Sequence, residues 1–398
     1  MSIVGVIVEY NPFHNGHKYH LEQAKTLSGA DYVVAIMSGN FVQRGIPAIT
    51  DKYTRTAMAL QNGADIVYEL PAFYATSSAE SFAYGAVSIL NGLGVIDYLC
   101  FGAEDNDLSL MQEIAKLLNQ EPSSYTSHIK RELSNGIPFP VARKNALIPL
   151  LSGKNSLYIE HFLESSNNIL GIEYLKALAL LQSNITPLIV KRQGSIYNEE
   201  GLPSPSTFPS ATALRKSYCL NASLKPYAPF VPKSAFDLLN DAKNKSFPLE
   251  LDDFSEYLYY KLSYITYEDL ITYVDISPDL AMRILKLRRD FTNISEFANK
   301  IKTRQFTLTR IQRVLLHILL NVRIGMAPSP YAHLLGFKKA STSIINKKRA
   351  SIPIITKSAD SKKLLEHDIF CTDLYNRVVA KKFQYCIASD FTHPLIIQ

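Results

Sequence analysis

The chain has 398 residues, of which 47% are hydrophobic and 20% are charged, as is ordinary for a globular protein with room for two domains. We expect no membrane span, because no apolar run approaches about 20 residues, and no signal peptide, because the first strand carries Glu9 without a basic flank. Four scattered cysteines without C-x-x-C spacing favour reduced thiols in a cytoplasmic protein.

Charge is divided unevenly along the chain. Residues 1–220 carry 16 lysines and arginines against 19 acidic side chains, whereas residues 221–398 carry 26 against 17. The first part therefore has a net charge of −3 and the second a net charge of +9. This asymmetry predicts a polyanionic partner that is bound mostly by the second half.

The first hundred residues alternate between predicted strands and helices. Strands are predicted at 3–9, 31–37, 65–69 and 97–101, and helices at 17–28, 51–62 and 77–91. A glycine that can end a helix precedes three of these strands: Gly29, Gly63 and Gly94. This order predicts an α/β fold with a Rossmann-like parallel sheet wrapped by helices.

Ligands of such folds bind beyond the carboxyl ends of the strands. We therefore expect the segments that follow the four strands to line one cleft: Tyr10–His17, Ser38–Gly45, Leu70–Tyr74 and Phe101–Asp105.

The remainder of the chain is predicted to be mainly helical. Helices are expected within 107–182 and 233–325, separated by a strand at 185–190, a loop at 194–209 and a helix that Ser210 caps. Three prolines place a boundary near residues 220–232, which divides the chain into 1–220 and 221–398. The mixed pattern of residues 340–398 is interpreted as a small α/β element packed on the helices.

The segment His14-Asn15-Gly16-His17 follows the first strand and a turn at Asn11-Pro12, at the start of a helix. The spacing puts both imidazoles on one face, where free N–H groups favour a phosphate. We interpret the segment as a nucleotide site in which His14 and His17 stabilise charge as an α-phosphate is attacked. Two surface histidines are the alternative. A metal site is not predicted, because the pair lacks further suitable ligands.

Polar or glycine residues also follow the other strands. Gln43 and Arg44 offer donors to an anion, and Lys52 and Arg55 on the next helix either add positive charge or form a solvated face. Further candidates for ribose, base and phosphate contacts are Gly102, Asn167, Asn168, Arg192 and Arg215.

The basic residues of the second half concentrate within 281–350. That segment holds fifteen lysines and arginines against only Asp290 and Glu296, and aromatic residues such as Phe306 and Phe337 lie between them. A basic surface with aromatic side chains suits RNA, whose phosphates give affinity and whose unstacked bases pack on rings. A solvated surface is the alternative.

The chain resembles the bacterial tRNA(Met) cytidine acetate ligases, which belong to the HIGH-type nucleotidyltransferases. The resemblance spans most of the chain and rests on five blocks: Val8–His17, Met37–Gly45, Asn167–Gly171, Ser210–Lys216 and Thr309–Arg313. It implies that ATP and acetate form acetyl-adenylate and pyrophosphate. The acetyl group then passes to the wobble cytidine of elongator tRNA(Met), giving N4-acetylcytidine. Ile46 and Ser166 depart from the family pattern, which has an acidic residue and a proline there.

The resemblance also implies which residues form the sites. His14 and His17 are the catalytic residues. Independently of the resemblance, Mg²⁺ is expected to accompany the triphosphate, and Arg310 and Arg313 of the basic segment are expected to bind tRNA. Residues 1–220 then form the ATP-binding nucleotidyltransferase domain and residues 221–398 the mainly helical tRNA-binding domain. The implied ATP-binding residues are Ile7, Val8, Glu9, Tyr10, Asn11, Pro12, Phe13, His14, Asn15, Gly16, His17, Lys18, Tyr19, His20, Gly102, Asn167, Arg192 and Gln193.

Two other functions remain compatible with the residues. An adenylyltransferase acting on a small metabolite would account for the histidine motif but not for the basic second half. A non-catalytic RNA-binding or assembly factor would account for the basic half but would leave His14 and His17 without a role.

Overall fold

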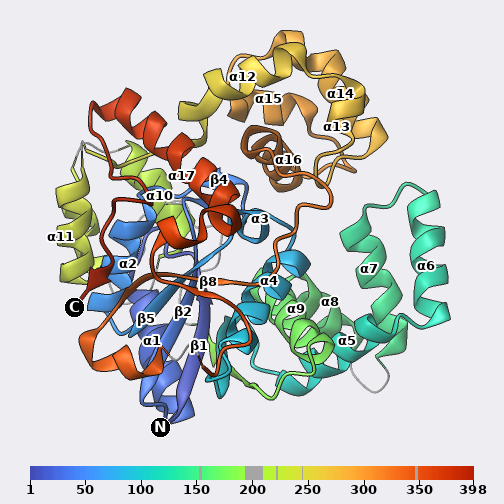
Figure 1. Cartoon of the computed structure of the whole chain (residues 1–398). Helices are drawn as coiled ribbons and strands as arrows, with labels where there is room; N and C mark the ends of the chain where they lie inside the picture. The colour runs from blue at the N-terminus through green and yellow to red at the C-terminus, as the bar shows by residue number, and fades with distance from the viewer. Residues whose placement is uncertain (152–154, 193–208, 221–222, 244, 346–347) are drawn as a thin grey trace.

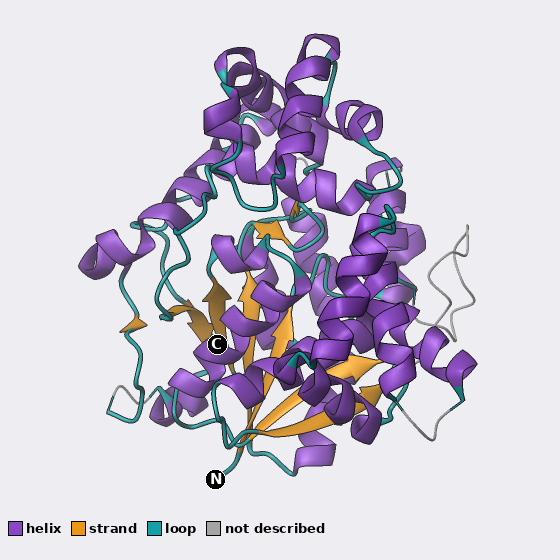
Figure 2. Ribbon diagram, turned by 90° about the vertical axis from the view of Figure 1, so that its right-hand side faces the viewer, coloured by secondary structure: helices purple, strands orange, loops and turns teal. Residues whose placement is uncertain are grey.

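The computed structural model describes the chain except for residues 152–154, 193–208, 221–222, 244 and 346–347. A central sheet is covered by helices on both faces, and a bundle of helices lies beyond one end of its strands (Figure 1, Figure 2). No described helix combines the length and the apolar character that crossing a membrane requires.

Eight of the described strands form one sheet in the order β10-β8-β5-β2-β1-β6-β7, with β9 also paired to β8. The strands are β1 (Ile3–Val8), β2 (Tyr32–Ser38), β5 (Ile66–Leu70), β6 (Tyr98–Ala103), β7 (Thr186–Lys191), β8 (Ala332–Phe337), β9 (Ile354–Ile355) and β10 (Ile396–Ile397). The run from β5 to β7 is parallel, which confirms the predicted Rossmann-like α/β fold. A separate hairpin pairs β3 (Phe41–Val42) with β4 (Ile46–Pro47).

The chain changes direction across the sheet at β1. From β1 it runs outward through β2 and β5, and it then returns to the other side of β1 to form β6 and β7. In doubly wound sheets the crevice at such a reversal is where a nucleotide binds. The loops after β1 and β6 therefore flank the expected site.

The helices cover the sheet in two layers. One face carries α1 (Asn15–Ser28), α2 (Lys52–Gln61), α10 (Ala211–Leu220) and α11 (Lys233–Ala242). The other carries α4 (Ala79–Gly92), α5 (Leu108–Gln120) and α9 (Ser166–Leu180), with α6 (Ser123–Ser134), α7 (Phe139–Leu147) and α8 (Ser156–Glu164) beyond them.

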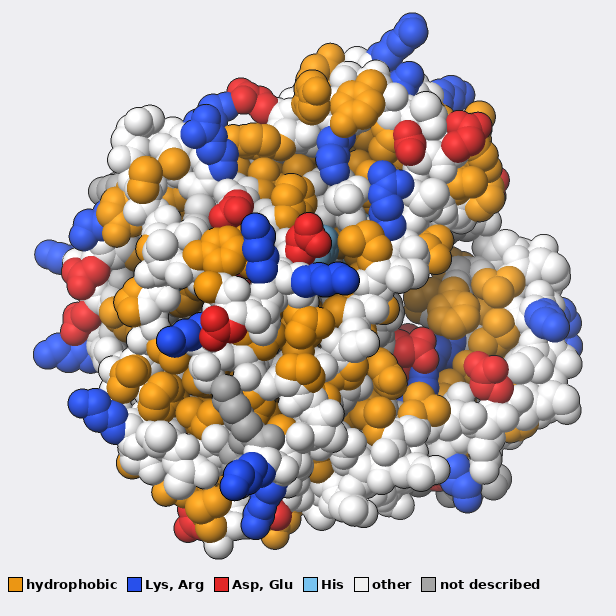
Figure 3. Space-filling view, in the orientation of Figure 1, with side chains coloured by type: hydrophobic (Ala, Val, Ile, Leu, Met, Phe, Trp, Pro, Cys, Tyr) orange, Lys and Arg blue, Asp and Glu red, His pale blue; other side chains and the backbone are white. Residues whose placement is uncertain are grey.

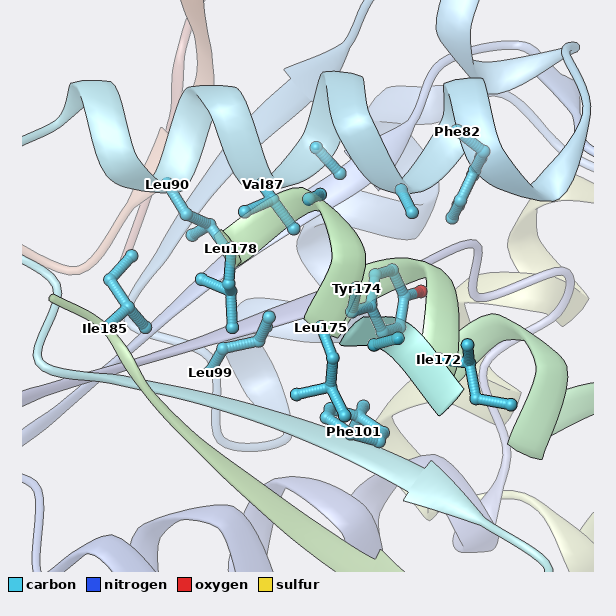
Figure 4. Packing of buried hydrophobic residues seen from close by; sticks show 14 of the residues in the cluster. Phe82, Val87, Leu90, Leu99, Phe101, Ile172, Tyr174, Leu175, Leu178 and Ile185 are labelled. Atoms are coloured by element: carbon cyan, nitrogen blue, oxygen red, sulfur yellow. The ribbon is translucent and has the colours of Figure 1, made fainter. Parts of the chain in front are cut away.

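The packing between α4, α9 and β6 shows how tightly this second layer is built (Figure 4). Val87 and Leu90 of α4 lie with Leu178 of α9 above Leu99 of β6, and all four are buried. At Gly171 a β-carbon would come within 2.6 Å of the Phe101 ring, so only glycine lets α9 approach the strand this closely. This packing fixes the start of α9 at the carboxyl end of β6.

The helical bundle has its own core. It consists of α12 (Ser255–Tyr264), α13 (Tyr267–Leu270), α14 (Pro278–Leu287), α15 (Ile294–Ile301) and α16 (Leu308–Leu320). The same core includes Phe41 of β3 and Ala72 of the short helix α3 (Ala72–Ala75), and the Phe41 ring lies 5.5 Å from that of Phe254. The bundle is therefore joined directly to loops that follow β2 and β5.

Residues 340–398 differ in part from the expectation. Their strands β9 and β10 extend the main sheet by pairing with β8, which lies just before this segment and pairs antiparallel with β5. Helix α17 (Lys362–Phe383) does pack on the helices, since several of its buried residues belong to the core of the helical bundle. The edge of β5 needs a hydrogen-bonding partner, which β8 supplies. The division at residue 220 stays a prediction about function, since residues 221–398 contribute to both the bundle and the sheet.

Candidate active site

The turn between β1 and α1 has an unusual backbone. Tyr10 adopts a left-handed conformation with φ of 51°, and the Asn11–Pro12 peptide is cis. The Asn11 carboxamide oxygen accepts a hydrogen bond from the Ile49 N–H at 2.8 Å, while the Asn11 carbonyl accepts one from Arg215. These contacts turn the chain sharply, so that His14 becomes the N-cap of α1.

The two histidines of the motif hold each other in place. His14 Nδ1 accepts a hydrogen bond from the Gly16 N–H at 3.0 Å, and His17 Nδ1 accepts one from the His14 N–H at 3.3 Å. Because both Nδ1 atoms are acceptors, each neutral ring must carry its proton on Nε2. The rings are stacked with centroids 3.7 Å apart. The site thus holds two Nε2–H donors on stacked rings.

Both imidazoles are neutral near pH 7. Burial, followed by the positive charges of Arg192 and Arg215, lowers the pKa of His14 to about 3. Burial, His14 and Arg192 also lower the pKa of His17 well below its ordinary value, and burial with Arg192 lowers that of His20 to about 4. Burial disfavours any added charge on these rings, while the charges of Arg192 and Arg215 near His14 favour an anionic ligand there.

Arginines approach the histidines from three segments. They are Arg44 in the β3–β4 hairpin, Arg192 after β7 and Arg215 on α10. Arg215, on α10, donates to the Asn11 carbonyl at 2.6 Å and to Thr212 Oγ1 at 3.0 Å. Burial lowers the pKa of Arg215 to about 10, with an opposing effect from Glu9 and a further lowering from Arg44. Ser210 caps this helix as predicted, accepting from the Ala213 N–H at 3.1 Å.

Glu9 joins the loops that follow β1 and β2. Its carboxylate accepts a hydrogen bond from the Gln43 N–H at 2.9 Å, in the β3–β4 hairpin. Arg55, which is fully buried, donates to the carbonyls of Glu9 at 2.7 Å and Ser38 at 2.9 Å, and also to the Gly39 carbonyl. The segment Ser38–Gly45 therefore reaches the first loop, as the parallel sheet predicted.

The loops after β6 and β7 close the other side. Arg192 extends from β7 with its N–H bonded to the Ala103 carbonyl at 2.9 Å, and its side chain lies beside Gly102, where a β-carbon would be 3.4 Å from Arg192 Cγ. Asn167 donates from Nδ2 to Glu104 Oε1 at 2.5 Å, and the Glu104 carboxylate also accepts two N–H groups at the start of α9. Gln193 lies outside the described residues.

The residues of Ile7–His20, which are predicted to bind ATP, lie in different environments. Ile7 and Val8 belong to β1, and the Phe13 ring is fully buried against Tyr10 and His17. Lys18 lies on the outer side of α1, where it pairs with Glu22 at 3.9 Å and its side chain is 48% exposed. Within this stretch the candidate site is therefore centred on His14 and His17, the first buried and the second half-buried.

Sequence reasoning did not find the buried roles of Lys52 and Arg55. The expectation of added positive charge or a solvated face is wrong for both, because neither is exposed to solvent. Lys52 Nζ lies 2.8 Å from Glu69 Oε2 and 2.9 Å from Asp390 Oδ2, so its charge is used inside the protein. Asp390 is more than 300 residues away along the chain, and no local pattern links the two.

The two arginines predicted to bind tRNA lie in different environments. Arg310, half-buried at the start of α16, donates to the Asp275 carbonyl at 3.1 Å and lies over the Phe306 ring. Arg313 Nε is 3.7 Å from Asp275 Oδ2, and its side chain is only 15% exposed. The Gly45 turn of the β3–β4 hairpin packs on the backbone of Arg313. Arg310 is thus the better placed of the two to reach a phosphate.

The sequence model of the family described as HIGH Nucleotidyl Transferase matches residues 1–389. The chain is also 41% identical over 410 residues to a tRNA(Met) cytidine acetate ligase of Thermoanaerobacter sp. strain X514, and 40% identical over 418 residues to that of Acetivibrio thermocellus. In both cases 100% of each chain is covered. The chain belongs to the tRNA(Met) cytidine acetate ligases of the HIGH nucleotidyl transferase family.

Two solved structures support the same relationship. The apo form of Thermotoga maritima TmcAL superposes with a TM-score of 0.93 at 32% sequence identity, covering 100% of this chain and 99% of the other. A second form of TmcAL, bound with alpha-thio ATP, superposes with a TM-score of 0.91 at the same identity and coverage.

Proposed function

We propose that this protein is an ATP-dependent acetate ligase that acetylates the wobble cytidine of elongator tRNA(Met), and that it acts in the cytoplasm. The observation that carries the proposal is the stacked pair of His14, which is buried, and His17, which is half-buried, because the pair offers two Nε2–H donors near Arg192 and Arg215. The choice of acetate and tRNA as substrates is supported by family membership. The chain matches a tRNA(Met) cytidine acetate ligase over the full length of both proteins.

In the first step an acetate oxygen attacks the α-phosphorus of ATP. The bond from that phosphorus to the oxygen bridging to the β-phosphate breaks, so acetyl-adenylate and pyrophosphate form. Charge grows on the phosphoryl oxygens and on the leaving pyrophosphate. His14 and His17 donate from Nε2 to these oxygens, and Arg44, Arg192 and Arg215 provide the opposing charge.

In the second step the exocyclic N4 of the cytidine attacks the acetyl carbonyl carbon. The bond from that carbon to the AMP oxygen breaks, AMP leaves, and N4 loses a proton. Forming the amide from this mixed anhydride requires mainly that the cytidine is held in the correct position. We therefore assign tRNA binding to the second half of the chain. Arg310 is proposed as one of its phosphate contacts.

Magnesium is proposed to enter with the triphosphate. Among the described residues, no three His, Cys, Asp or Glu side chains cluster as a metal site. Mg²⁺ bound to a nucleotide takes most of its ligands from phosphates and water and needs few from the protein. The chemistry that it would supply is charge neutralisation on the phosphates.

The proposal is tested by incubating the protein with ATP, magnesium, labelled acetate and elongator tRNA(Met). Label in the tRNA that depends on both ATP and acetate is the expected result, and a transcript with uridine at the wobble position is the control. Acetate-dependent exchange of pyrophosphate into ATP isolates the first step. Exchange with another acid, or transfer to a small acceptor without tRNA labelling, would overturn the substrate assignment.

A matched pair of variants tests the site residues. His17→Ala removes one Nε2–H donor, whereas His128→Ala changes a histidine on α6 that contacts Arg131 and Glu132 of the same helix. Pyrophosphate exchange should fall by at least about 100-fold in the first variant, by analogy with loss of a donor to a developing oxyanion, and should be retained in the second.

A further inference from the structure

The loop after β6 and the start of α9 are held together by reciprocal hydrogen bonds. Oε2 of the Glu104 carboxylate accepts from the N–H groups of Asn167 and Asn168, both at 3.1 Å. In return, Asn168 Oδ1 accepts from the N–H groups of Glu104 and Asp105, also at 3.1 Å. Asn168 is buried and donates from Nδ2 to the Phe162 carbonyl at 3.2 Å. The loop and the helix start are therefore fixed relative to each other.

The same carboxylate orients one amide side chain. Glu104 Oε1 accepts a hydrogen bond from Asn167 Nδ2 at 2.5 Å. An ionised carboxylate can only accept, so the NH₂ group of Asn167, and not its oxygen, must face Glu104. Asn167 Oδ1 is then turned away from Glu104, and none of the described residues donates to it. Because Asn167 is only half-buried, it offers a fixed acceptor to a ligand.

This acceptor lies beside the crevice where a nucleotide is expected. Asn167 is in the first turn of α9, at the carboxyl end of β6, and β6 neighbours β1 where the chain reverses direction across the sheet. The N–H of Arg192 donates to the Ala103 carbonyl at 2.9 Å, which brings the end of β7 to the same edge. A ligand in the crevice is therefore within reach of both segments.

The charges at this edge distinguish the two ends of a nucleotide. On the face drawn in Figure 3, basic and acidic side chains are intermixed. At the strand ends they are separated, because Arg192 and Arg215 act on His14, whereas no described cation forms an ion pair with Glu104. A phosphate beside Glu104 would face a carboxylate whose charge no cation offsets. The nucleoside is therefore the end that fits beside Asn167, with the phosphates toward the histidines.

We propose that Glu104 is a positioning residue for ATP, because it fixes Asn167 so that Oδ1 accepts a hydrogen bond from the nucleoside. This inference rests on the proposed function. A ribose hydroxyl and the amino group of adenine are both donors that satisfy such an acceptor. Glu104 acts through Asn167 and makes no contact with the ligand itself.

The substitution Glu104→Gln is expected to reverse the Asn167 amide. Glutamine has the shape of glutamate, but one of its two polar atoms is an NH₂ donor. When the remaining oxygen keeps the two backbone N–H groups, the new NH₂ faces Asn167, whose oxygen must then turn toward it. The ligand meets a donor where the parent protein offers an acceptor. A general loss of structure would instead weaken all nucleotides alike, without changing which one is preferred.

The test measures the Kd of ATP, purine riboside triphosphate, 2′-deoxy-ATP and 3′-deoxy-ATP by isothermal titration calorimetry with the full chain and magnesium. The parent should bind the analogue that lacks the contacted group about 3- to 10-fold more weakly than ATP, as expected for one hydrogen bond. The rejected analogue then identifies the adenine amino group or a ribose hydroxyl as the donor. This preference should disappear in Glu104→Gln and in Asn167→Ala. It should persist in Glu113→Gln, a matched change at an exposed position of α5.

A parent protein that binds all four nucleotides equally would overturn the proposal, as would a Glu104→Gln variant that keeps the preference while Asn167→Ala loses it. Far-ultraviolet circular dichroism checks folding. Should Glu104→Gln fail to fold, Glu104→Asp, which retracts the carboxylate by one methylene, should lose the same preference. These measurements need neither acetate nor tRNA. Absence of acetate-dependent pyrophosphate exchange in the parent would therefore contradict the proposed function and leave the result on Glu104 standing.

Discussion

Replacing Lys52 by methionine is expected to destabilise the protein more than any change on its surface. Lys52 is not exposed, and its ammonium lies within 3.1 Å of oxygens of Glu69, Asp390 and Thr372. It therefore ties α2, β5, α17 and the carboxy-terminal tail together. Methionine fills a similar volume but leaves two buried carboxylates without their cation.

The expected loss is about 3–5 kcal/mol in the free energy of unfolding, which is typical when one partner of a buried ion pair is removed. The loss should depend on pH. Burial by itself raises the pKa of Glu69, but Lys52 and His333 lower it to about 2. In the parent protein this stabilisation is present above the unfolded pKa of about 4.5 and is lost as the pH falls toward 2. The difference between parent and variant should therefore shrink in acid.

Urea unfolding followed by far-ultraviolet circular dichroism measures this loss, since the chain has no tryptophan. Lys381→Met is the control, because Lys381 pairs with Glu256 at the surface, where their side chains are 54% and 79% exposed. Its effect should stay within about 0.5 kcal/mol. A loss below about 1 kcal/mol for Lys52→Met, or one that is unchanged between neutral pH and pH 3, would refute the reasoning.

Other substitutions test the site and its link to the bundle. His14→Ala, like His17→Ala, should lower pyrophosphate exchange by at least about 100-fold while leaving the tRNA Kd unchanged; full activity of the double variant would contradict their role. Because the pKa of His14 is held near 3, exchange should show no acid limb near about pH 6.5, where an ordinary histidine titrates. Arg310→Ala should weaken tRNA binding and reduce its salt slope by about one unit, as filter binding at several salt concentrations would show. Gly45→Ala should lower both stability and exchange activity, since its β-carbon would lie 2.4 Å from a backbone nitrogen of α16, whereas Gly136→Ala, with similar φ but open surroundings, should cost only about 1–2 kcal/mol.

The order of elements in the first half could be predicted because their signals are local. Apolar runs define β1, β2, β5 and β6, and glycine after each helix marks where the chain turns back. The rule that parallel strands place their following loops at one edge then predicted that Tyr10–His17 and Ser38–Gly45 lie close together. The histidine motif could be found in the same way, because a strand, a turn and a helix N-terminus are contiguous in sequence.

Only the tertiary structure decided which charges face the ligand and which are buried. Lys52 and Arg55 look like surface cations until Asp390 and the carbonyls of Glu9 and Ser38 are placed around them. Equally, nothing in the sequence of residues 332–337 predicts that they pair with β5 across more than 260 residues. Contacts between residues that are far apart in the sequence depend on which strand edges and buried charges still lack partners once the local helices and strands have formed. Those are properties of the folded molecule as a whole.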